Sequence, residues 1–391
     1  MKVRDAWRLS MKLLPMHQRH RHASKRPPVW ILVLVCVVCF FLIFGFVYPP
    51  HNSSACYLFS SSGCRAFSDW LPPSGRREIT DEELASQVLI KELLRSPLPP
   101  TKSPKIAFMF LTTGALPFEM LWDRFFSGHE GKFSIYVHAS KSRTVHQSRY
   151  FVNSNIPSDE VVWGQVSMID AERRLLGNAL KDPHNHHFVL LSDSCVPLHK
   201  FEYVYNYLMY SNLSYIDSFV DPGPHGNERF STHMLPEIKK ENFRKGAQWF
   251  TMKRQHALVL ISDSLYYSKF KNFCKPGFEG RNCYSDEHYI PTLFNMIDPV
   301  GVANWSVTHV DWSEHLWHPK SYRSQDVSYE LLQNLTSIDV SVHETSESWK
   351  PSDVKPCLWN GVKRPCYLFA RKFYPETLDI LTQLFSDYTA A

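Results

Sequence analysis

Hydrophobic and polar positions divide the chain into one long apolar segment, a Ser- and Pro-rich stretch and a region of short alternating elements. The apolar segment covers residues 29–48, twenty residues without a charged side chain, and about 20 residues span the hydrocarbon core of a bilayer. The tail before it, residues 1–28, carries eight Lys or Arg residues and a single acid, Asp5. Because a basic tail stays cytoplasmic, we expect a single-pass type II transmembrane anchor with everything after it on the luminal side.

A cleaved signal peptide would have a shorter apolar core, about 7–15 residues, followed by an A-x-A-like site. This segment is longer and no such site follows it.

Residues 49–104 are rich in Ser and Pro and suit an extended luminal stem. One helix is predicted within it, because Thr80 and Glu83 form a capping box. The apolar residues of this helix recur at helical spacing and are Leu84, Val88, Leu89 and Leu93. We expect the face that they form to pack on the domain that follows.

From residue 105 to residue 391 the pattern alternates between strands and helices. Strand-like runs cover 106–114, 133–140, 160–164 and 187–194, and helical patterns cover 118–126, 167–180 and 201–210. This alternation predicts an α/β domain with a mainly parallel central sheet. Ligands of such sheets bind beyond the carboxyl ends of the strands, here residues 112–114, 138–140 and 192–195.

Charge and cysteine content narrow the class of protein. The net charge of the whole chain, +5, is smaller than the net positive charge of residues 1–28 alone, so the rest of the chain is slightly acidic. Nucleic acid is therefore not an expected partner. In an oxidising lumen we expect three disulfides, Cys56–Cys64, Cys274–Cys283 and Cys357–Cys366, with Cys195 left as a small buried side chain. Four N-glycosylation sequons fall on the luminal side, at Asn52, Asn212, Asn304 and Asn334. No pattern fixes the oligomeric state.

Common nucleotide and hydrolase motifs are absent. The chain has no P-loop, no G-x-G-x-x-G and no G-x-S-x-G. The His-rich run at 184–187 has no accompanying zinc motif, and we interpret it as a solvated loop.

Segments spread over residues 105–373 resemble the core-2/I-branching N-acetylglucosaminyltransferase family, most closely its plant, brittle-culm-type branch. They occur in the family's order: IAFMFLTTG, IYVHAS, VVWGQVSMIDAERRLLGNAL, HFVLLSDSCVPL, FRKGAQWFTMKRQHA, CYSDEHYIPTLF and CLWNGVKRPCYLFARKF. The resemblance implies a GT-A-like fold and an inverting transfer from a UDP-sugar to a glycan hydroxyl, with no cofactor and no required metal. It also implies a membrane-anchored enzyme of the Golgi.

An inverting transfer needs a base that takes the proton of the acceptor hydroxyl. The resemblance assigns this role to Glu287, in the run Cys283-Tyr-Ser-Asp-Glu-His. Ser285 is the expected N-cap of a helix over 288–296. The alternative is that Asp286 and Glu287 only complement the dipole of this helix.

Charge on the leaving diphosphate must be met by a cation. The chain contains no D-x-D metal motif, and Asp193 stands alone at the corresponding strand end. By resemblance, Lys363 and Lys372 match the basic residues that meet the diphosphate, but Arg364 is adjacent and Arg371 is also a candidate. Which of Lys363 and Arg364 binds phosphate stays open, because Arg binds phosphate with two hydrogen bonds and Lys acts as a point charge.

Further binding residues follow from the same resemblance and from side-chain chemistry. Val137 and His138 resemble the uridine contact, and Thr113 lies in a turn facing the same crevice. Asp170 and Glu172 we interpret as structural residues of the helix over 167–180, and Arg173 and Arg174 as its packing and salt-bridge residues. For the acceptor we expect Trp249, Trp312 and Glu314, which offer flat apolar faces and a carboxylate.

The sequence thus predicts a Golgi glycosyltransferase that transfers a sugar, most simply N-acetylglucosamine, to a glycoprotein or cell-wall glycan. A glucuronosyl or other UDP-sugar donor is an open alternative, as is a non-catalytic luminal glycan-binding protein. A glycoside hydrolase would need two opposed carboxylates, and the sequence offers one.

Overall fold

The structure is a computed structural model, which describes residues 29–47, 78–94, 104–141, 145–314, 316, 318–346 and 351–389. It divides into two compact units, Met1–Glu78 and Ile79–Ala391. In the first, α1 covers Val29–Val47. A search of the described residues finds no helix with the length and hydropathy that crossing a membrane requires. The anchor over 29–48 therefore stays a prediction, and Asn52 and the Cys56–Cys64 bridge lie outside the described residues.

The second unit is built on a six-stranded sheet in the order β2-β1-β3-β6-β5-β9. Its strands are β1 Lys105–Thr112, β2 Phe133–Ala139, β3 Asn185–Ser192, β5 Ser214–Asp217, β6 Thr251–Lys253 and β9 Val302–Asn304. β1 pairs in parallel with β2 and β3, and β5 with β9, whereas β6 is antiparallel to both of its neighbours. The sheet is mixed rather than mainly parallel, because the three-residue β6 enters it from the opposite end.

Three predicted helices are confirmed: α4 Glu119–Phe126, α5 Ser167–Ala179 and α6 Phe201–Met209. The strand predicted over 160–164 is wrong. Among the described residues, this segment pairs with no strand. It leads through turns into α5, and Val162 and Trp163 are exposed, so its β-branched residues do not lie in a sheet. The prediction of a solvated loop over 184–187 is also wrong, because β3 begins at Asn185 and both Asn185 and His187 are buried.

Helix α3, Asp81–Leu94, confirms the capping box predicted before the domain. Glu83 N donates to Thr80 Oγ1 over 3.3 Å, and Thr80 N donates to a Glu83 carboxylate oxygen over 3.2 Å. Leu84 and Val88 are buried in the core of the domain. Helix α3 is thus part of the folded unit, as predicted, but Leu93 of the predicted apolar face is 84% exposed.

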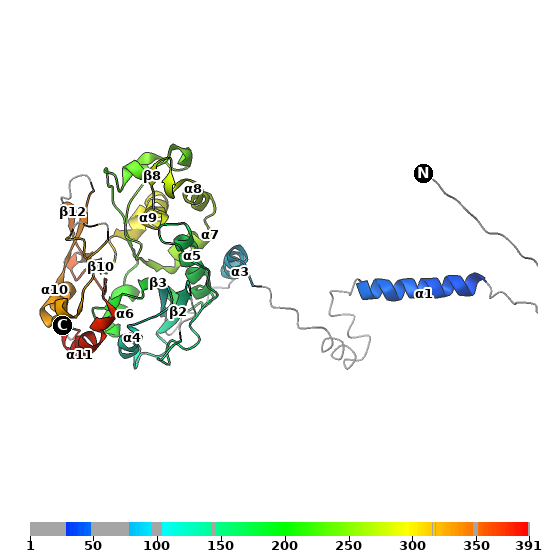
Figure 1. The fold of residues 1–391 in the computed structure, drawn as a ribbon, viewed down its shortest axis with the longest axis horizontal. Coiled ribbons are helices and arrows are strands. Elements are labelled where there is room, and N and C mark those ends of the chain that lie inside the picture. Colours follow the sequence, from blue (N-terminus) through cyan, green and yellow to red (C-terminus); the bar gives the residue numbers. More distant parts are fainter. Residues whose placement is uncertain are drawn as a thin grey trace, which may run out of the picture. The chain divides into compact units, whose positions relative to one another are not determined.

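The remaining elements extend the domain beyond the sheet (Figure 1). The helices are α7 Arg254–Ser262, α8 Leu265–Phe273, α9 Ser285–Ile297, α10 Tyr329–Ser337 and α11 Leu378–Tyr388. A second sheet joins β10 Thr308–Val310, β15 Phe369–Arg371 and β4 Val196–Pro197. Short hairpins are β7 Pro276–Phe278 with β8 Arg281–Asn282, β11 Val340–Glu344 with β12 Pro351–Pro356, and β13 Leu358–Trp359 with β14 Val362–Lys363.

Two predicted disulfides are confirmed, Cys274–Cys283 around the β7–β8 hairpin and Cys357–Cys366 around the β13–β14 hairpin. The turn of the second hairpin is Asn360-Gly361, and both residues have positive φ, 50° and 80°. Asn and Gly adopt this backbone region most readily, which explains why the chain turns there.

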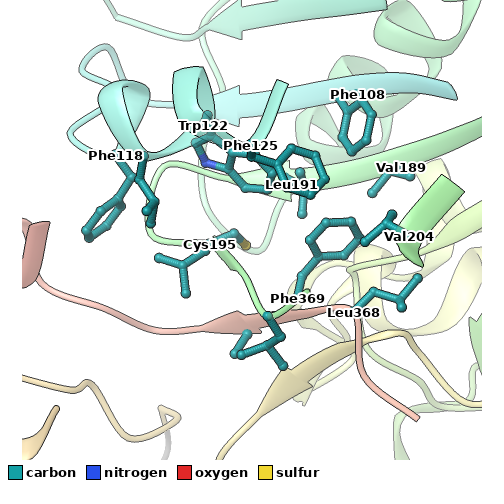
Figure 2. Packing of buried hydrophobic residues seen from close by; sticks show 14 of the residues in the cluster. Phe108, Phe118, Trp122, Phe125, Val189, Leu191, Cys195, Val204, Leu368 and Phe369 are labelled. Atoms are coloured by element: carbon teal, nitrogen blue, oxygen red, sulfur yellow. The ribbon is translucent and has the colours of Figure 1, made fainter. Parts of the chain in front are cut away.

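Alternate residues of β1 enter two hydrophobic cores on opposite faces of the sheet. Phe108 and Phe110 belong to one core, and Met109 and Leu111 to the other. Figure 2 shows the first, in which Cys195 lies among aromatic side chains. Cys195 is free and buried, as predicted.

Candidate active site

Glu287 lies in the first turn of α9, directly after the Cys274–Cys283 bridge. The N-cap is Tyr284, with no side-chain cap, so the prediction that Ser285 caps the helix is wrong. The Ser285 hydroxyl instead donates to Cys274 O over 3.1 Å, because Ser285 is buried against the bridged loop. The bridge and this hydrogen bond together fix where α9 begins.

Arg229 is the main partner of the Glu287 side chain. Arg229 Nη1 donates to Glu287 Oε2 over 2.6 Å and to His288 Nε2 over 3.3 Å, and the guanidinium lies 4.7 Å from the centre of the Tyr284 ring. His288 Nδ1 donates to Arg244 O over 2.8 Å. Burial and then the charge of Arg229 lower the pKa of His288 well below its usual value, so His288 is a neutral acceptor that helps to orient Arg229.

Gly246 lies in the segment before β6 and brings it against this helical turn. Its N–H donates to Glu287 O over 2.9 Å. A Cβ atom on Gly246 would lie 1.9 Å from Asp217 O, far inside van der Waals contact. Only glycine therefore allows the chain to pass between Asp217 and α9.

Two buried acids lie close to each other near the start of α9: Asp286, which is next to Glu287 in the chain, and Glu172, which interacts with Asp286. Burial and then the charge of Glu287 raise the pKa of Asp286 to about 7. Burial raises the pKa of Glu172 well above its usual value, and its Oε1 accepts a hydrogen bond of 2.9 Å from Gln248 Nε2. Glu287 differs from both because 28% of its side chain is exposed.

A cationic group forms at the carboxyl end of β3. Burial raises the pKa of Asp193, an effect opposed by the charges of Arg371 and then Lys372. The Arg371 guanidinium lies 4.2 Å from the centre of the Trp249 ring. The structure thus brings three residues together that the sequence analysis singled out, Asp193, Arg371 and Lys372. In the described residues, no three His, Cys, Asp or Glu side chains are grouped so that they could hold a metal ion.

Lys363 and Arg364 make other contacts. Lys363 Nζ lies 3.3 Å from Asp339 Oδ2, and both side chains are largely exposed. The Arg364 guanidinium lies 3.4 Å from the centre of the Tyr207 ring and donates to the Tyr215 hydroxyl. These contacts pair both cations with protein groups, and their binding of phosphate stays a prediction.

One short segment connects the acid and the cationic groups. Gly246 contacts Glu287, Gln248 contacts Glu172 and Trp249 contacts Arg371. Three residues of extended chain span at most about 11 Å. The backbone positions of Gly246 and Trp249 therefore lie within about 11 Å of each other.

The predicted uridine residues lie at the ends of β1 and β2. Val137 is buried, and its backbone bonds to Ser154 and Ile156. His138 is buried, which lowers its pKa to about 4, and it lines a pocket bounded by α3, α5 and α8. Thr113 is exposed just after β1.

The predicted acceptor residues do not share one environment. Trp249 is only 6% exposed and lies under Arg371, which leaves little of its ring for a sugar. Trp312 and Glu314 are exposed between β10 and α10.

Arg229 was missed by the sequence analysis, and no motif around it points to Glu287. The unusual position of Glu172 could be recognised from the sequence. It lies on the buried face of α5 with Met168, Leu175 and Leu176, where an acid is rare. Arg173 and Arg174 act in packing and salt bridges as predicted: Arg173 donates to Ile261 O, and Arg174 bonds to Asp81.

The family model "Branch: Core-2/I-Branching enzyme" matches residues 106–336. The chain therefore belongs to the core-2/I-branching family of glycosyltransferases, as the resemblance indicated. Among its relatives is the rice (Oryza sativa subsp. japonica) protein named "Glycosyltransferase BC10", 37% identical over 316 residues, which cover 72% of this chain and 76% of the rice protein. The family match includes Arg229 and Glu287 and ends before Arg371 and Lys372.

Proposed function

We propose that this chain is an inverting glycosyltransferase in which Glu287 is the catalytic base. The observation that carries the proposal is the contrast between Glu287 and the two buried acids Asp286 and Glu172. Asp286 and Glu172 are buried with raised pKa values, whereas Glu287 is partly exposed and oriented by Arg229. Of these three, Glu287 has the side chain that is open to a bound hydroxyl.

In the proposed reaction, Glu287 takes the proton of the acceptor hydroxyl while the acceptor oxygen attacks the anomeric carbon of the donor sugar. The bond from this carbon to the UDP oxygen breaks on the opposite face, so the configuration inverts. Arg229 keeps the carboxylate in place through its bond to Oε2 and leaves Oε1 for the acceptor.

We propose Arg371 and Lys372 as the cations that meet the diphosphate. They lie next to Asp193 at the strand end where such sheets bind ligands, and their preformed charge would stabilise the leaving group without reorganisation. The contacts of Lys363 and Arg364 favour structural roles for those two residues. The absence of a D-x-D motif supports a transfer that needs no metal.

We further propose a UDP-sugar donor, with N-acetylglucosamine as the transferred sugar by family analogy, and a glycoprotein or cell-wall glycan as acceptor. The apolar stretch over 29–48 and the basic tail before it support a type II Golgi membrane protein with a luminal catalytic domain.

The test is a transfer assay of the purified full-length chain with a panel of UDP-sugars and plant glycans, with and without EDTA. We expect transfer with inversion, highest for UDP-N-acetylglucosamine and unchanged by EDTA. Transfer from no donor would contradict the proposed activity, and transfer restored only by manganese would contradict the role of Arg371 and Lys372.

A further inference from the structure

An exposed aromatic side chain stands two residues before one of the predicted glycosylation sites. Tyr210 follows the end of α6 and is 71% exposed, and the sequon of Asn212 begins two residues later. The residues two positions before the other two described sequons, Val302 and Leu332, are buried. Among the sequons that the structure describes, the one at Asn212 alone has an exposed ring at this spacing.

Three hydrogen bonds hold the turn that carries Asn212. The Ser211 hydroxyl oxygen accepts from Leu213 N over 3.3 Å and from the Tyr215 hydroxyl over 2.8 Å. Lys253 Nζ donates to Asn212 O over 3.2 Å. These bonds engage the backbone around Asn212, and the residue itself is exposed. The point at which a sugar would be attached is therefore preorganised, which lowers the entropy cost of a contact made by that sugar.

A second exposed ring is tied to the same turn. Trp359 Nε1 donates to Tyr210 O over 3.3 Å, which connects the β13–β14 hairpin to the end of α6. Trp359 pairs with Val362 across this hairpin, and both side chains are exposed. Tyr210, Trp359 and Val362 thus give the chain apolar surface near Asn212, which we call the Tyr210–Trp359 surface.

The Tyr210–Trp359 surface lies at the opposite edge of the sheet from the proposed donor cations. β6 is antiparallel to both β3 and β5, so β5 runs in the same direction as β3. Asn212 precedes β5, and its partner Lys253 pairs with His187 near the start of β3. Asp193 instead follows the carboxyl end of β3. A glycan on Asn212 would therefore leave the site of transfer open.

We propose that Asn212 carries an N-glycan whose innermost N-acetylglucosamine packs against the Tyr210 ring, with Trp359 beside it, and that this contact stabilises the fold. A pyranose presents a face of C–H groups that a phenol ring can cover, while its hydroxyls stay in water. The contact removes apolar surface from water. Because the sugar is covalently attached, it loses no translational freedom on binding. The inference uses the luminal orientation proposed above and no part of the transfer chemistry.

The sequon favours the glycan over a partner protein as the cover of this surface. The Cα atoms of Tyr210 and Asn212 are at most about 7 Å apart, so a glycan on Asn212 stands beside the ring. N-glycans are bulky and hydrated, and one at this place hinders a protein from lying flat on Tyr210. The attached sugar is therefore the occupant that both the spacing and the exposure predict.

The test is a double-mutant cycle on the full-length chain, produced in plant cells that make only high-mannose glycans. Mass spectrometry measures the occupancy of Asn212, and thermal unfolding at one scan rate measures stability. We expect an occupied Asn212. Asn212→Gln and Tyr210→Ala should each lower the unfolding midpoint by about 1–3 °C, and the double variant should fall no further than either single variant. Tyr210→Phe should keep the wild-type midpoint, as should trimming of the glycan to its innermost sugar with an endoglycosidase.

Two matched controls separate the contact from general effects of a glycan or a ring. Asn334→Gln removes a sequon without an aromatic two residues before it, and it should leave the midpoint unchanged. Tyr329 is an exposed aromatic of α10, outside the Tyr210–Trp359 surface. Any effect of Tyr329→Ala should therefore add in full to that of Asn212→Gln.

Additive effects of Asn212→Gln and Tyr210→Ala would overturn the proposal, as would a trimmed chain that is as unstable as Asn212→Gln. Glycans at Asn304 and Asn334 but not at Asn212 would overturn it and leave the luminal orientation intact, whereas a chain without any glycan would contradict both. Because no transfer is measured, a chain that shows this coupling but transfers no sugar would contradict the proposed function and support the glycan contact.

Discussion

Arg229 donates hydrogen bonds to two neighbouring side chains of α9, the carboxylate of Glu287 and the neutral ring of His288. Its loss would free the carboxylate to rotate and would leave a buried imidazole nitrogen without its donor. We expect Arg229→Ala to lower kcat about 10- to 100-fold with little change in the KM of the UDP-sugar. Steady-state kinetics on the folded variant measure this split.

The matched control for Arg229 is Arg149→Ala, because Arg149 is an exposed arginine paired with Glu130, and its kinetics should equal those of the wild type. Arg229→Lys should fall between, since a single ammonium cannot serve both partners as a guanidinium does. A wild-type kcat in Arg229→Ala would remove Arg229 from the site.

Asp286 makes the stability of the fold depend on pH. Its pKa of about 7 in the folded chain lies above the ordinary value of 3.8. The folded chain therefore keeps a proton that the unfolded chain loses between these pH values, and stability falls as pH rises through this window. The slope from this group reaches about 1.4 kcal/mol per pH unit.

Asp286→Asn should remove this contribution, because the amide does not ionise. Unfolding midpoints of both chains across the window from pH 4 to pH 7 check the prediction, since other groups titrate equally in the two and cancel in the difference. Parallel curves for wild type and variant would show that Asp286 is already ionised in the folded chain.

Helix α3 marks the beginning of the folded domain, and two of its leucines allow its docking to be tested. Leu84 is 6% exposed and Leu93 is 84% exposed in the same helix. We expect Leu84→Ala to lower the free energy of unfolding by about 2–4 kcal/mol and Leu93→Ala by less than about 0.5 kcal/mol. Denaturant unfolding of the full-length variants measures both, and equal effects would mean that α3 is not docked on the domain.

Elements with a long, clear hydrophobic period were predictable from the sequence. β1, β2, β3, α4, α5 and α6 follow such patterns, and the capping box and two disulfides depend on spacing along the chain. β6 has three residues and no period of its own, so only its neighbours place it in the sheet. The segment 160–164 has strand composition without a partner strand, and local sequence cannot reveal that.

Within the candidate site, the choice of Glu287 came from the family resemblance, which covers its neighbours in sequence, and its catalytic role stays a proposal. Arg229 lies 58 residues away from it along the chain, and Arg371 reaches Trp249 from another sheet. Such contacts depend on tertiary packing, which no local pattern encodes. Burial of Glu172 could be read from the helical period, but its closeness to Asp286 could not.

At the scale of the whole molecule, the proposed orientation places every sequon after residue 48 in the lumen. Asn212, Asn304 and Asn334 are all exposed, so each side chain is open to modification. We expect the full-length chain in plant cells to carry N-glycans at these three sites and to be protected from protease in sealed microsomes. Single Asn→Gln variants, compared by gel mobility before and after glycosidase treatment, assign each glycan. An unglycosylated, protease-sensitive chain would contradict the luminal orientation.

We propose one active site that holds a base and, separately, the cations for the diphosphate. Measuring transfer rate and UDP affinity in Glu287→Gln and Lys372→Ala tests it directly. We predict that Glu287→Gln loses about 100-fold or more in rate and binds UDP as the wild type does, whereas Lys372→Ala loses about tenfold or more in UDP affinity. Wild-type turnover in Glu287→Gln would contradict the role of Glu287 as the base, and wild-type UDP affinity in Lys372→Ala would contradict the role of Lys372 in binding the diphosphate.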